Sequence, residues 1–260
     1  MLTGSEAYTL TVRAVIFDFI GTLVSVKGYS LEASKRKLYR ALCEAGFSMA
    51  CDDFLIAYTQ SHEKYRVIRY GQLIEVTNAV WISEALNKLG FNIGPEDSRI
   101  KTAVNVFFDD YLNSLRVRRC AKKILKILSL NGFKLGLISN FTYAPLIYAA
   151  LRKLDLSRFF DVVLVSADIG WRKPHVRIFN EALRRLGVSA GEVIYIGDSP
   201  DEDIKGAKDV GMRTIHVASQ FYPQETLIRS MQNPDYATKS LCEAGKKLFQ
   251  ILGLESLRFC

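Results

Sequence analysis

A buried-strand signal that runs directly into a carboxylate constrains this chain more than any other feature. Residues 14–17 are all apolar (AVIF), Asp18 follows them, and Gly21 comes three residues later. A short apolar run bounded by a turn predicts a strand buried on both faces, as in the interior of a parallel sheet. Reactive groups in open α/β sheets lie beyond the carboxyl ends of such strands, and Asp18 stands at that position. An Asp here can also simply cap a turn, so the rest of the chain has to decide between the two interpretations.

The composition is that of a globular protein. The chain has 260 residues, which allows one large or two smaller domains, and 49% of them are apolar, which is enough for a substantial core. No apolar run reaches the length of a membrane helix, and the N-terminus lacks a basic patch followed by an apolar stretch. We therefore expect no membrane partner.

The cysteine pattern bears on the redox compartment. The five cysteines are odd in number and contain no Cys-x-x-Cys pair: Cys43, Cys51, Cys120, Cys242 and Cys260. This pattern argues against a disulfide framework or a zinc site, and it favours a reducing cytoplasm. We expect the cysteines to be small core or surface residues.

The net charge of +8 could attract nucleic acid or any other anion. The densest basic run is 116–123 (RVRRCAKK), and it contains no interleaved aromatic residue of the kind that a single-strand binder uses. Apolar residues at helical spacing accompany the run at Ala121, Ile124, Leu125 and Leu128. We therefore interpret it as the solvated face of a helix and expect no nucleic-acid partner.

Helical periodicity dominates the segment that follows the first strand. Ser30 can cap the first helix and Asp52 the second, Gly90 closes the third, and Pro95 begins the fourth. Four amphipathic helices with short connections are typical of a compact bundle. We predict a helical cap domain over residues 24–115.

From Cys120 onward the pattern changes to alternating helices and strands. Strands are predicted at 134–138, 162–165, 193–196 and 214–217, with a short strand at 235–237 and a closing helix near 241–252. Such alternation predicts a doubly wound α/β fold, in which helices cover both faces of a parallel sheet. Residues 1–23 and 116–260 would form this core domain.

Polar residues follow several of the predicted strands. Asp18 comes after the first, Ser139 after the second and Asp198 after a later one, while Lys173 lies in a loop before a helix. A parallel sheet places all its strand ends at one edge, so these groups can converge. A carboxylate nucleophile beside a cation suits phosphoryl transfer through an aspartyl-phosphate that water then hydrolyses. Asp18 and Asp198 could hold Mg²⁺, which prefers oxygen ligands.

The order of these motifs resembles that of haloacid dehalogenase (HAD) superfamily hydrolases with a helical cap inserted after the first motif. The segments that carry the resemblance are 18–23 (DFIGTL), 138–140 (ISN), 172–174 (RKP) and 197–204 (GDSPDEDI). The resemblance covers nearly the whole chain and implies a Rossmann-like core. It implies an enzyme that binds Mg²⁺ and a small anionic substrate between core and cap.

The resemblance also implies roles for individual residues. It makes Asp18 the nucleophile, with Ser139 and Lys173 as further catalytic groups. The implied substrate-binding residues are Thr22, Ser139, Asn140 and Lys173. The implied metal ligands are Asp18, Asp198 and the backbone carbonyl of Ile20, with Asp203 bound to the metal or directly behind its ligands.

Ile20 departs from the pattern of the superfamily's phosphatases. They have a second aspartate two positions after the nucleophile, which protonates the leaving oxygen and later activates water. Ile20 can neither give nor take a proton, and losing such a group typically costs ~10²–10⁴-fold in rate. A leaving group that needs little protonation, such as an acyl or aryl group, removes the need for this acid. His62 or another cap residue could supply a proton, although His62 lies on an apolar helix stripe, which favours a structural histidine.

Other members of the superfamily offer alternatives to a phosphohydrolase. A 2-haloacid dehalogenase also lacks the second aspartate, but Asp198 keeps the metal-binding form, and residues 58–61 (YTQS) lack the arginine that would bind halide. Arg66 and Arg69 lie close by in the sequence. A phosphonatase-like hydrolase is a lesser variant, and a regulatory protein that kept the site but lost turnover is the remaining one.

Overall fold

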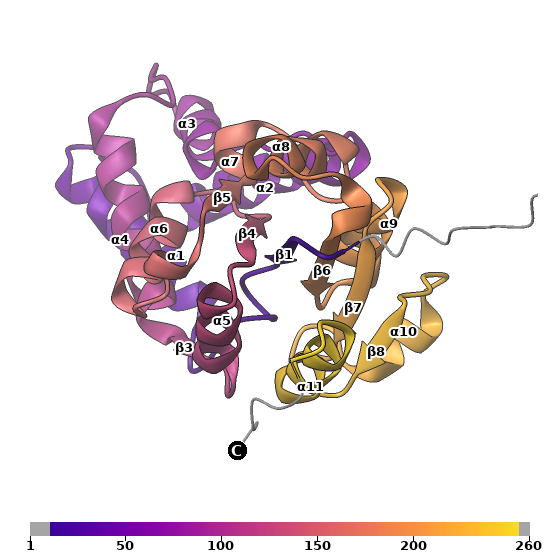
Figure 1. The fold of residues 1–260 in the computed structure, drawn as a ribbon. Helices are drawn as coiled ribbons and strands as arrows, with labels where there is room; N and C mark the ends of the chain where they lie inside the picture. The colour runs from indigo at the N-terminus through magenta and orange to yellow at the C-terminus, as the bar shows by residue number, and fades with distance from the viewer. Residues whose placement is uncertain (1–10, 255–260) are drawn as a thin grey trace, which may run out of the picture.

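The computed structural model describes residues 11–254 and shows a six-stranded parallel sheet with a helical segment at one end. The strand order is β5-β4-β1-β6-β7-β8, with every neighbouring pair parallel. Figure 1 shows β1 in the middle of this sheet, between β4 and β6. The doubly wound α/β fold predicted from the sequence is confirmed.

Apart from β2 and β3, the strands match the predicted apolar runs to within a residue or two. They are β1 (Ala14–Phe17), β2 (Val24–Val26), β3 (Leu115–Val117), β4 (Lys134–Ser139), β5 (Val162–Val165), β6 (Val193–Gly197), β7 (Arg213–Val217) and β8 (Tyr236–Thr238). The helices are α1 (Leu31–Glu44), α2 (Cys51–Gly71), α3 (Asn78–Lys88), α4 (Ser98–Ser114), α5 (Ala121–Leu130), α6 (Ala144–Lys153), α7 (Ser166–Ile169), α8 (Val176–Leu186), α9 (Lys205–Asp209), α10 (Gln224–Arg229) and α11 (Leu241–Ile251).

Strand β1 is buried on both faces, as its unbroken apolar run predicts. Its side chains alternate between two separate core clusters. Val15 and Phe17 pack in the cluster that contains residues of α5 and α11, whereas Ala14 and Ile16 pack in the cluster that contains residues of α8 and α9. Helices therefore cover both faces of the sheet, and Asp18 emerges at the end of its most central strand.

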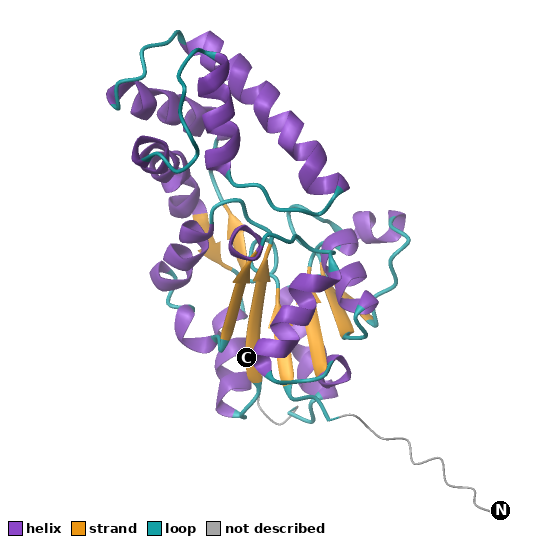
Figure 2. Cartoon of the chain, turned by 90° about the horizontal axis from the view of Figure 1, so that it is seen from above, coloured by secondary structure: helices purple, strands orange, loops and turns teal. Residues whose placement is uncertain are grey.

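The helical segment α1–α4 lies beyond the carboxyl ends of the sheet strands (Figure 2). Ser30 caps α1 as predicted, accepting a hydrogen bond from the backbone N–H of Ala33 at 3.3 Å. Two predicted helix starts are wrong. Helix α2 begins one residue before Asp52, and α4 begins after Asp97, which caps it, so that Pro95 lies in the preceding loop.

The periodicity did not predict the two short strands that flank this segment. Strands β2 and β3 pair antiparallel, with Val24 opposite Val117 and Val26 opposite Leu115. They bring the two ends of the helical segment together next to the sheet. The proposed boundaries of a cap domain at 24 and 115 coincide with this ribbon, and its existence as a separate domain stays a prediction.

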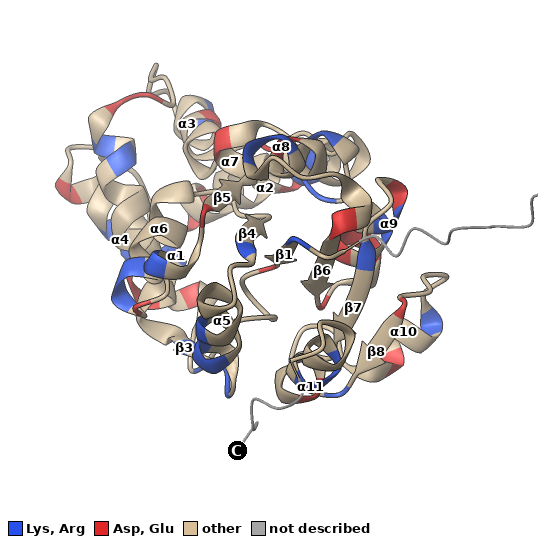
Figure 3. Cartoon of the chain, in the orientation of Figure 1, with Lys and Arg blue, Asp and Glu red and all other residues tan. Residues whose placement is uncertain are grey.

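The basic run 116–123 is only partly a helix face. Residues 116–117 belong to β3, and α5 begins at Ala121, whose apolar stripe is buried as predicted. Arg118 is half-buried, and its guanidinium donates to the backbone carbonyls of Gly21 and Ala218. Elsewhere, positive and negative residues are interspersed along the helices (Figure 3).

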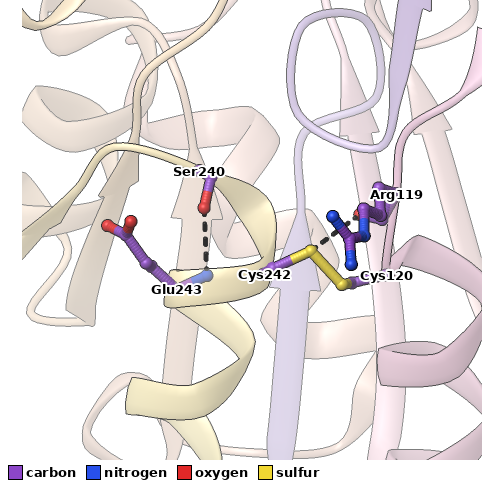
Figure 4. Close-up of a disulfide and its surroundings, with 5 residues drawn as sticks. All are labelled: Arg119, Cys120, Ser240, Cys242 and Glu243. Carbon is purple, nitrogen blue, oxygen red and sulfur yellow. Dashed lines mark hydrogen bonds between the residues drawn. A yellow bond between two sulfur atoms is a disulfide. The ribbon is translucent and has the colours of Figure 1, made fainter. Parts of the chain in front are cut away.

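The expectation that the cysteines form no disulfide is wrong. Cys120 and Cys242, 122 residues apart in the sequence, are joined by a disulfide between the start of α5 and the start of α11 (Figure 4). Cys43 and Cys51 are free, and Cys260 lies outside the described residues. Sequence spacing did not reveal the pair because tertiary folding alone brings the two helices together. The inference of a reducing compartment from the cysteine pattern therefore loses its basis. No helix in the described part of the chain is long and apolar enough to cross a membrane.

Candidate active site

The sequence-predicted polar residues meet at the carboxyl edge of the sheet. Asp18 follows β1, Ser139 ends β4, Asp198 follows β6, and Lys173 comes from the loop between α7 and α8. Each of these four side chains is buried. Their convergence follows from the strand order, because β4, β1 and β6 are neighbours in a parallel sheet.

Lys173 links two of the carboxylates directly. Its Nζ donates to Asp18 Oδ1 at 2.7 Å and lies 2.7 Å from Asp203 Oδ1. It also donates to the backbone carbonyl of Ile138 at 3.0 Å and to the hydroxyl of Tyr195 at 3.2 Å. The ammonium is thus held in place from several sides beside Asp18.

Asp203 is held by hydrogen bonds to both of its carboxylate oxygens. Oδ1 accepts from the hydroxyl of Tyr195 at 2.9 Å, and Oδ2 accepts from the backbone N–H groups of Asp198 and Ser199 at 3.1 and 3.0 Å. Gly197 allows this approach, because a Cβ on it would lie 2.4 Å from the carboxyl carbon of Asp203. Asp203 therefore orients the loop that carries Asp198.

Asp198 lies against the glycine turn that follows β1. Its Oδ2 accepts from the hydroxyl of Ser219 at 2.5 Å, and its backbone carbonyl is 2.8 Å from Nε2 of His216. A Cβ on Gly21 would lie 2.0 Å from Oδ2 of Asp198, and Gly21 has a φ of +104°. Both the backbone conformation and the close carboxylate therefore require glycine at this position.

The site carries more negative than positive charge. Three carboxylates (Asp18, Asp198 and Asp203) face one ammonium (Lys173), which gives a formal charge of −2. Burial raises the pKa of Asp18 from 3.8 to about 6, against the opposing effect of Lys173. Burial, together with the charges of the other two carboxylates, raises the pKa of Asp198 well above its usual value. Burial by itself would lower the pKa of Lys173, but the neighbouring carboxylates outweigh it and raise that pKa.

The donor set fits a divalent cation. One carboxylate oxygen from each of the three aspartates lies within 4.8 Å of the other two. Oδ2 of Asp18 is buried and has no hydrogen-bond partner among the described residues, which is costly unless a bound group supplies one. Hard cations such as Mg²⁺ take carboxylate oxygens, and two positive charges would balance the −2 of the site.

The remaining predicted site residues lie around this centre. Thr22 is fully buried, and its hydroxyl lacks a hydrogen-bond partner within the part of the chain that is described. The amide of Asn140 is engaged by the protein: its Oδ1 accepts from the N–H of Lys173 at 2.8 Å, and its Nδ2 donates to Glu202 at 2.9 Å. Asn140 thus holds the Lys173 loop. The half-buried side chain of Ile20 packs against the larger core cluster.

Several contributing residues escaped the sequence analysis. Tyr195 sits inside the apolar run of β6, where only its hydroxyl in an otherwise apolar strand could have drawn notice. Ser219 lies two residues beyond the end of β7, so the same strand-end argument that selected Asp18 could have selected it.

A buried ion-pair network ties the helical segment to the Lys173 loop. Glu75 has a fully buried side chain, and its two oxygens accept from Arg69 at 2.8 Å and from Arg172 at 2.6 Å. The hydroxyl of Ser166 also donates to Glu75. Backbone hydrogen bonds from Glu75 to Gly170 and from Arg172 to Leu73 reinforce the connection.

A cavity of about 530 Å³ lies between the helical segment and the sheet loops. Residues of α1 to α4 line one side, and Asn140, Arg172, Glu202 and Tyr222 line the other. Asn140 lines the cavity and accepts the N–H of Lys173, so the cavity lies next to the carboxylate centre, although the three aspartates and Lys173 are not among its lining residues. Burial, Tyr29 and the charge of Asp18 all contribute to raising the pKa of Tyr111, which lines the cavity from α4.

His62 lines this cavity instead of being buried in the bundle. Its ring stacks on Tyr58 and packs edge-on against Trp81, and its side chain remains 34% exposed. Burial lowers its pKa below 6.5, and the carboxylate of Glu63 only partly opposes this. His62 is therefore neutral near pH 7, which does not suit a general acid.

Comparisons with known proteins agree with this geometry. A family model described as haloacid dehalogenase-like hydrolase matches residues 12–211. The chain is 31% identical over 211 residues to a glyceraldehyde 3-phosphate phosphatase of Methanopyrus kandleri, with 79% of this chain and 84% of that protein covered. It is 26% identical over 202 residues to a ribulose-1,5-bisphosphate 5-phosphatase of Halopiger xanaduensis, with 78% and 83% covered. A 2-haloacid dehalogenase from Pseudomonas syringae shares the fold at a TM-score of 0.66 and 22% identity, with 94% and 99% covered.

Proposed function

This chain belongs to the haloacid dehalogenase-like hydrolases, and we propose that it is a Mg²⁺-dependent phosphohydrolase with Asp18 as its nucleophile. The observation that carries the proposal is the buried carboxylate of Asp18, held by Lys173 at one oxygen and left without a partner among the described residues at the other. An unsatisfied oxygen in a buried site beside a cation is suited to attack an electrophilic phosphorus. The similarity to sugar-phosphate phosphatases supports a small phosphorylated metabolite as the substrate.

We expect the reaction to proceed in two steps, transfer of the phosphoryl group to Asp18 and hydrolysis of the aspartyl-phosphate. In the first, an oxygen of Asp18 forms a bond to phosphorus, and the bond from phosphorus to the leaving oxygen breaks. In the second, water attacks phosphorus, phosphate leaves, and the Asp18 carboxylate is regenerated. Lys173 holds Asp18 in place and offsets the repulsion between the carboxylate and the phosphoryl oxygens. Ser139, at the end of β4, and the buried Thr22 would donate to those oxygens.

The aspartate cluster would hold the metal. Asp18, Asp198 and the backbone carbonyl of Ile20 are the proposed ligands. Asp203 would hold Asp198 in position, because its carboxylate accepts hydrogen bonds from the backbone N–H groups of Asp198 and Ser199. Mg²⁺, when bound, would supply positive charge that polarises the phosphoryl group.

We further propose that residues 24–115 act as a cap that encloses the substrate. The cavity lies between this segment and the sheet loops, and enclosure there would exclude water from the reacting atoms. The Glu75 network would hold the cap against the loop that carries Lys173.

Release of inorganic phosphate tests the proposal. We expect the purified protein to hydrolyse phosphate monoesters or acyl phosphates in Mg²⁺ and to lose this activity in EDTA. Asp18→Asn should abolish it, while Asp161→Asn, in the loop before β5, should leave it unchanged. Chloride release from L-2-chloropropionate that EDTA does not affect would instead identify a dehalogenase. Phosphate-analogue binding without any turnover would identify a regulatory protein.

A further inference from the structure

The wall of the cavity between the helical segment and the sheet loops is rich in aromatic side chains. Of the twenty described residues that line it, nine are Phe, Tyr or Trp, whereas these types make up 11% of the whole chain. They come from both sides: Tyr29 and Tyr111 belong to the helical segment, and Phe141 and Tyr222 belong to the sheet loops. A group that enters this cavity meets aromatic rings on both sides as well as polar side chains, and the rings favour another planar ring.

The cavity is large for the substrates named for the related phosphatases. Its volume of about 530 Å³ lies in the range of sites that enclose drug-sized ligands, ~300–1,000 Å³. A triose phosphate with its phosphoryl group at Asp18, which is not among the lining residues, would leave most of this space unfilled.

The charged residues of the wall already have partners. Arg69 and Arg172 share the buried carboxylate of Glu75, and Lys35 pairs with Glu32 at 2.8 Å. These are the three Lys or Arg residues among the described residues that line the cavity. A second phosphate or a carboxylate on the substrate would have to displace one of these pairs, so the wall disfavours a bisphosphate such as ribulose 1,5-bisphosphate.

The chemistry of the centre points in the same direction. Ile20 stands two residues after Asp18, where the resemblance to phosphatases of the superfamily implies the proton donor, and its side chain packs against the core. Without a donor there, the leaving group must depart as a weakly basic anion. A phenolate meets this requirement because its ring delocalises the charge, whereas an alkoxide does not.

We propose that the substrate is an aryl phosphate monoester, with a planar aromatic leaving group in the cap cavity and no second anionic group. This proposal rests on the phosphohydrolase function proposed above. The bond between phosphorus and the aryl oxygen breaks as Asp18 takes the phosphoryl group, and the phenolate then takes its proton from water. Hydrolysis of the aspartyl-phosphate then places one oxygen of water on phosphorus and frees the Asp18 carboxylate, so that one water is consumed overall and one phenol and one phosphate are formed.

The first test compares substrates on the wild-type protein. We expect kcat/KM to be higher for 4-nitrophenyl phosphate and phenyl phosphate than for glyceraldehyde 3-phosphate, and KM to be lower for both aryl esters than for acetyl phosphate. Phenylphosphonate should inhibit at least about tenfold more strongly than methylphosphonate, since only the former fills the aromatic cavity.

The second test substitutes the more exposed aromatic residues of the wall, because their replacement does not disturb the packing of the core. Tyr70 is 54% exposed and Tyr29 is half-buried. Tyr70→Leu and Tyr29→Leu should each raise KM for phenyl phosphate by roughly 2- to 10-fold, the range of one aromatic pair, and should raise KM for acetyl phosphate by less. Tyr236→Leu is the matched control, because Tyr236 is also partly exposed but lies on β8 outside the described cavity wall.

The outcomes separate the two proposals. Faster hydrolysis of glyceraldehyde 3-phosphate than of either aryl ester, or equal inhibition by the two phosphonates, would overturn the aryl substrate and leave the phosphohydrolase in place. Failure to release phosphate from every compound in Mg²⁺ would refute the phosphohydrolase and the aryl substrate with it.

Discussion

Restoring an acid at position 20 is the change that most directly tests the chemistry of this site. The half-buried Ile20 side chain leaves the nucleophile without a proton donor two residues away. We predict that Ile20→Asp raises kcat/KM for alkyl phosphates such as glycerol 3-phosphate, because an alkoxide leaving group needs a proton. Hydrolysis of 4-nitrophenyl phosphate should change little, because its leaving group does not.

The magnitude follows from the electrostatics of the neighbouring carboxylate. Burial raises the pKa of Asp18 from 3.8 to about 6, which corresponds to roughly 3 kcal/mol against ionisation. A carboxyl group at position 20 would lie two residues from Asp18, and the nearby carboxylates would raise its pKa, so that part of it stays protonated at neutral pH. A positioned acid contributes ~10²–10⁴-fold, so a gain of at least about tenfold should survive this partial protonation.

Steady-state kinetics with glycerol 3-phosphate and 4-nitrophenyl phosphate measure this effect. Ile20→Asn is the matched control, because asparagine has nearly the shape of aspartate but no acidic proton. The gain of Ile20→Asp on glycerol 3-phosphate should fall as the pH rises above its raised pKa, whereas Ile20→Asn should show no gain at any pH. Equal behaviour of the two variants, or a folded Ile20→Asp protein with unchanged alkyl phosphatase activity, would refute the reasoning.

Three further predictions concern the charge balance and the covalent link. Lys173→Met should lower kcat by ~10²–10³-fold, and in EDTA it should also lower the Tm, because it leaves Asp18 buried without its cation. A decrease in kcat of less than tenfold would contradict this role of Lys173. The rise in Tm on adding Mg²⁺ should be larger at pH 7.5 than at pH 5.5. Because the pKa of Asp18 is raised, its proton stabilises the folded metal-free protein below about pH 6, and this stabilisation is lost as the pH rises. Bound Mg²⁺ replaces it at the higher pH. A larger Mg²⁺-induced increase in Tm at pH 5.5 than at pH 7.5 would contradict Asp18 as a metal ligand. Reducing the Cys120–Cys242 disulfide, which closes a loop of 122 residues, should cost up to about 5 kcal/mol of unfolding free energy by denaturant titration, whereas Cys43→Ser should cost little; equal midpoints with and without reductant would count against the bond.

The apolar runs of the sequence determined the strands of the sheet and the positions of several active-site residues. An apolar run that ends in a polar residue reports both a buried strand and the position of its carboxyl end, so Asp18, Ser139 and Asp198 could be placed at one edge before any coordinates were known. The family implied by the motif order is confirmed by the match over residues 12–211. Helix starts were less secure, as at Pro95, because several polar residues in a row can serve as a cap.

Only the tertiary structure decided which groups lie opposite one another. Lys173 meets Asp18 across 155 positions of the sequence, and Cys120 meets Cys242 across 122. The pairing of Glu75 with Arg172 and the aromatic wall of the cavity likewise join segments that local periodicity treats as independent. Periodicity records which face of an element is buried but not what it is buried against. The partners therefore follow from the packing of whole elements, which the sequence encodes only through their combined fit.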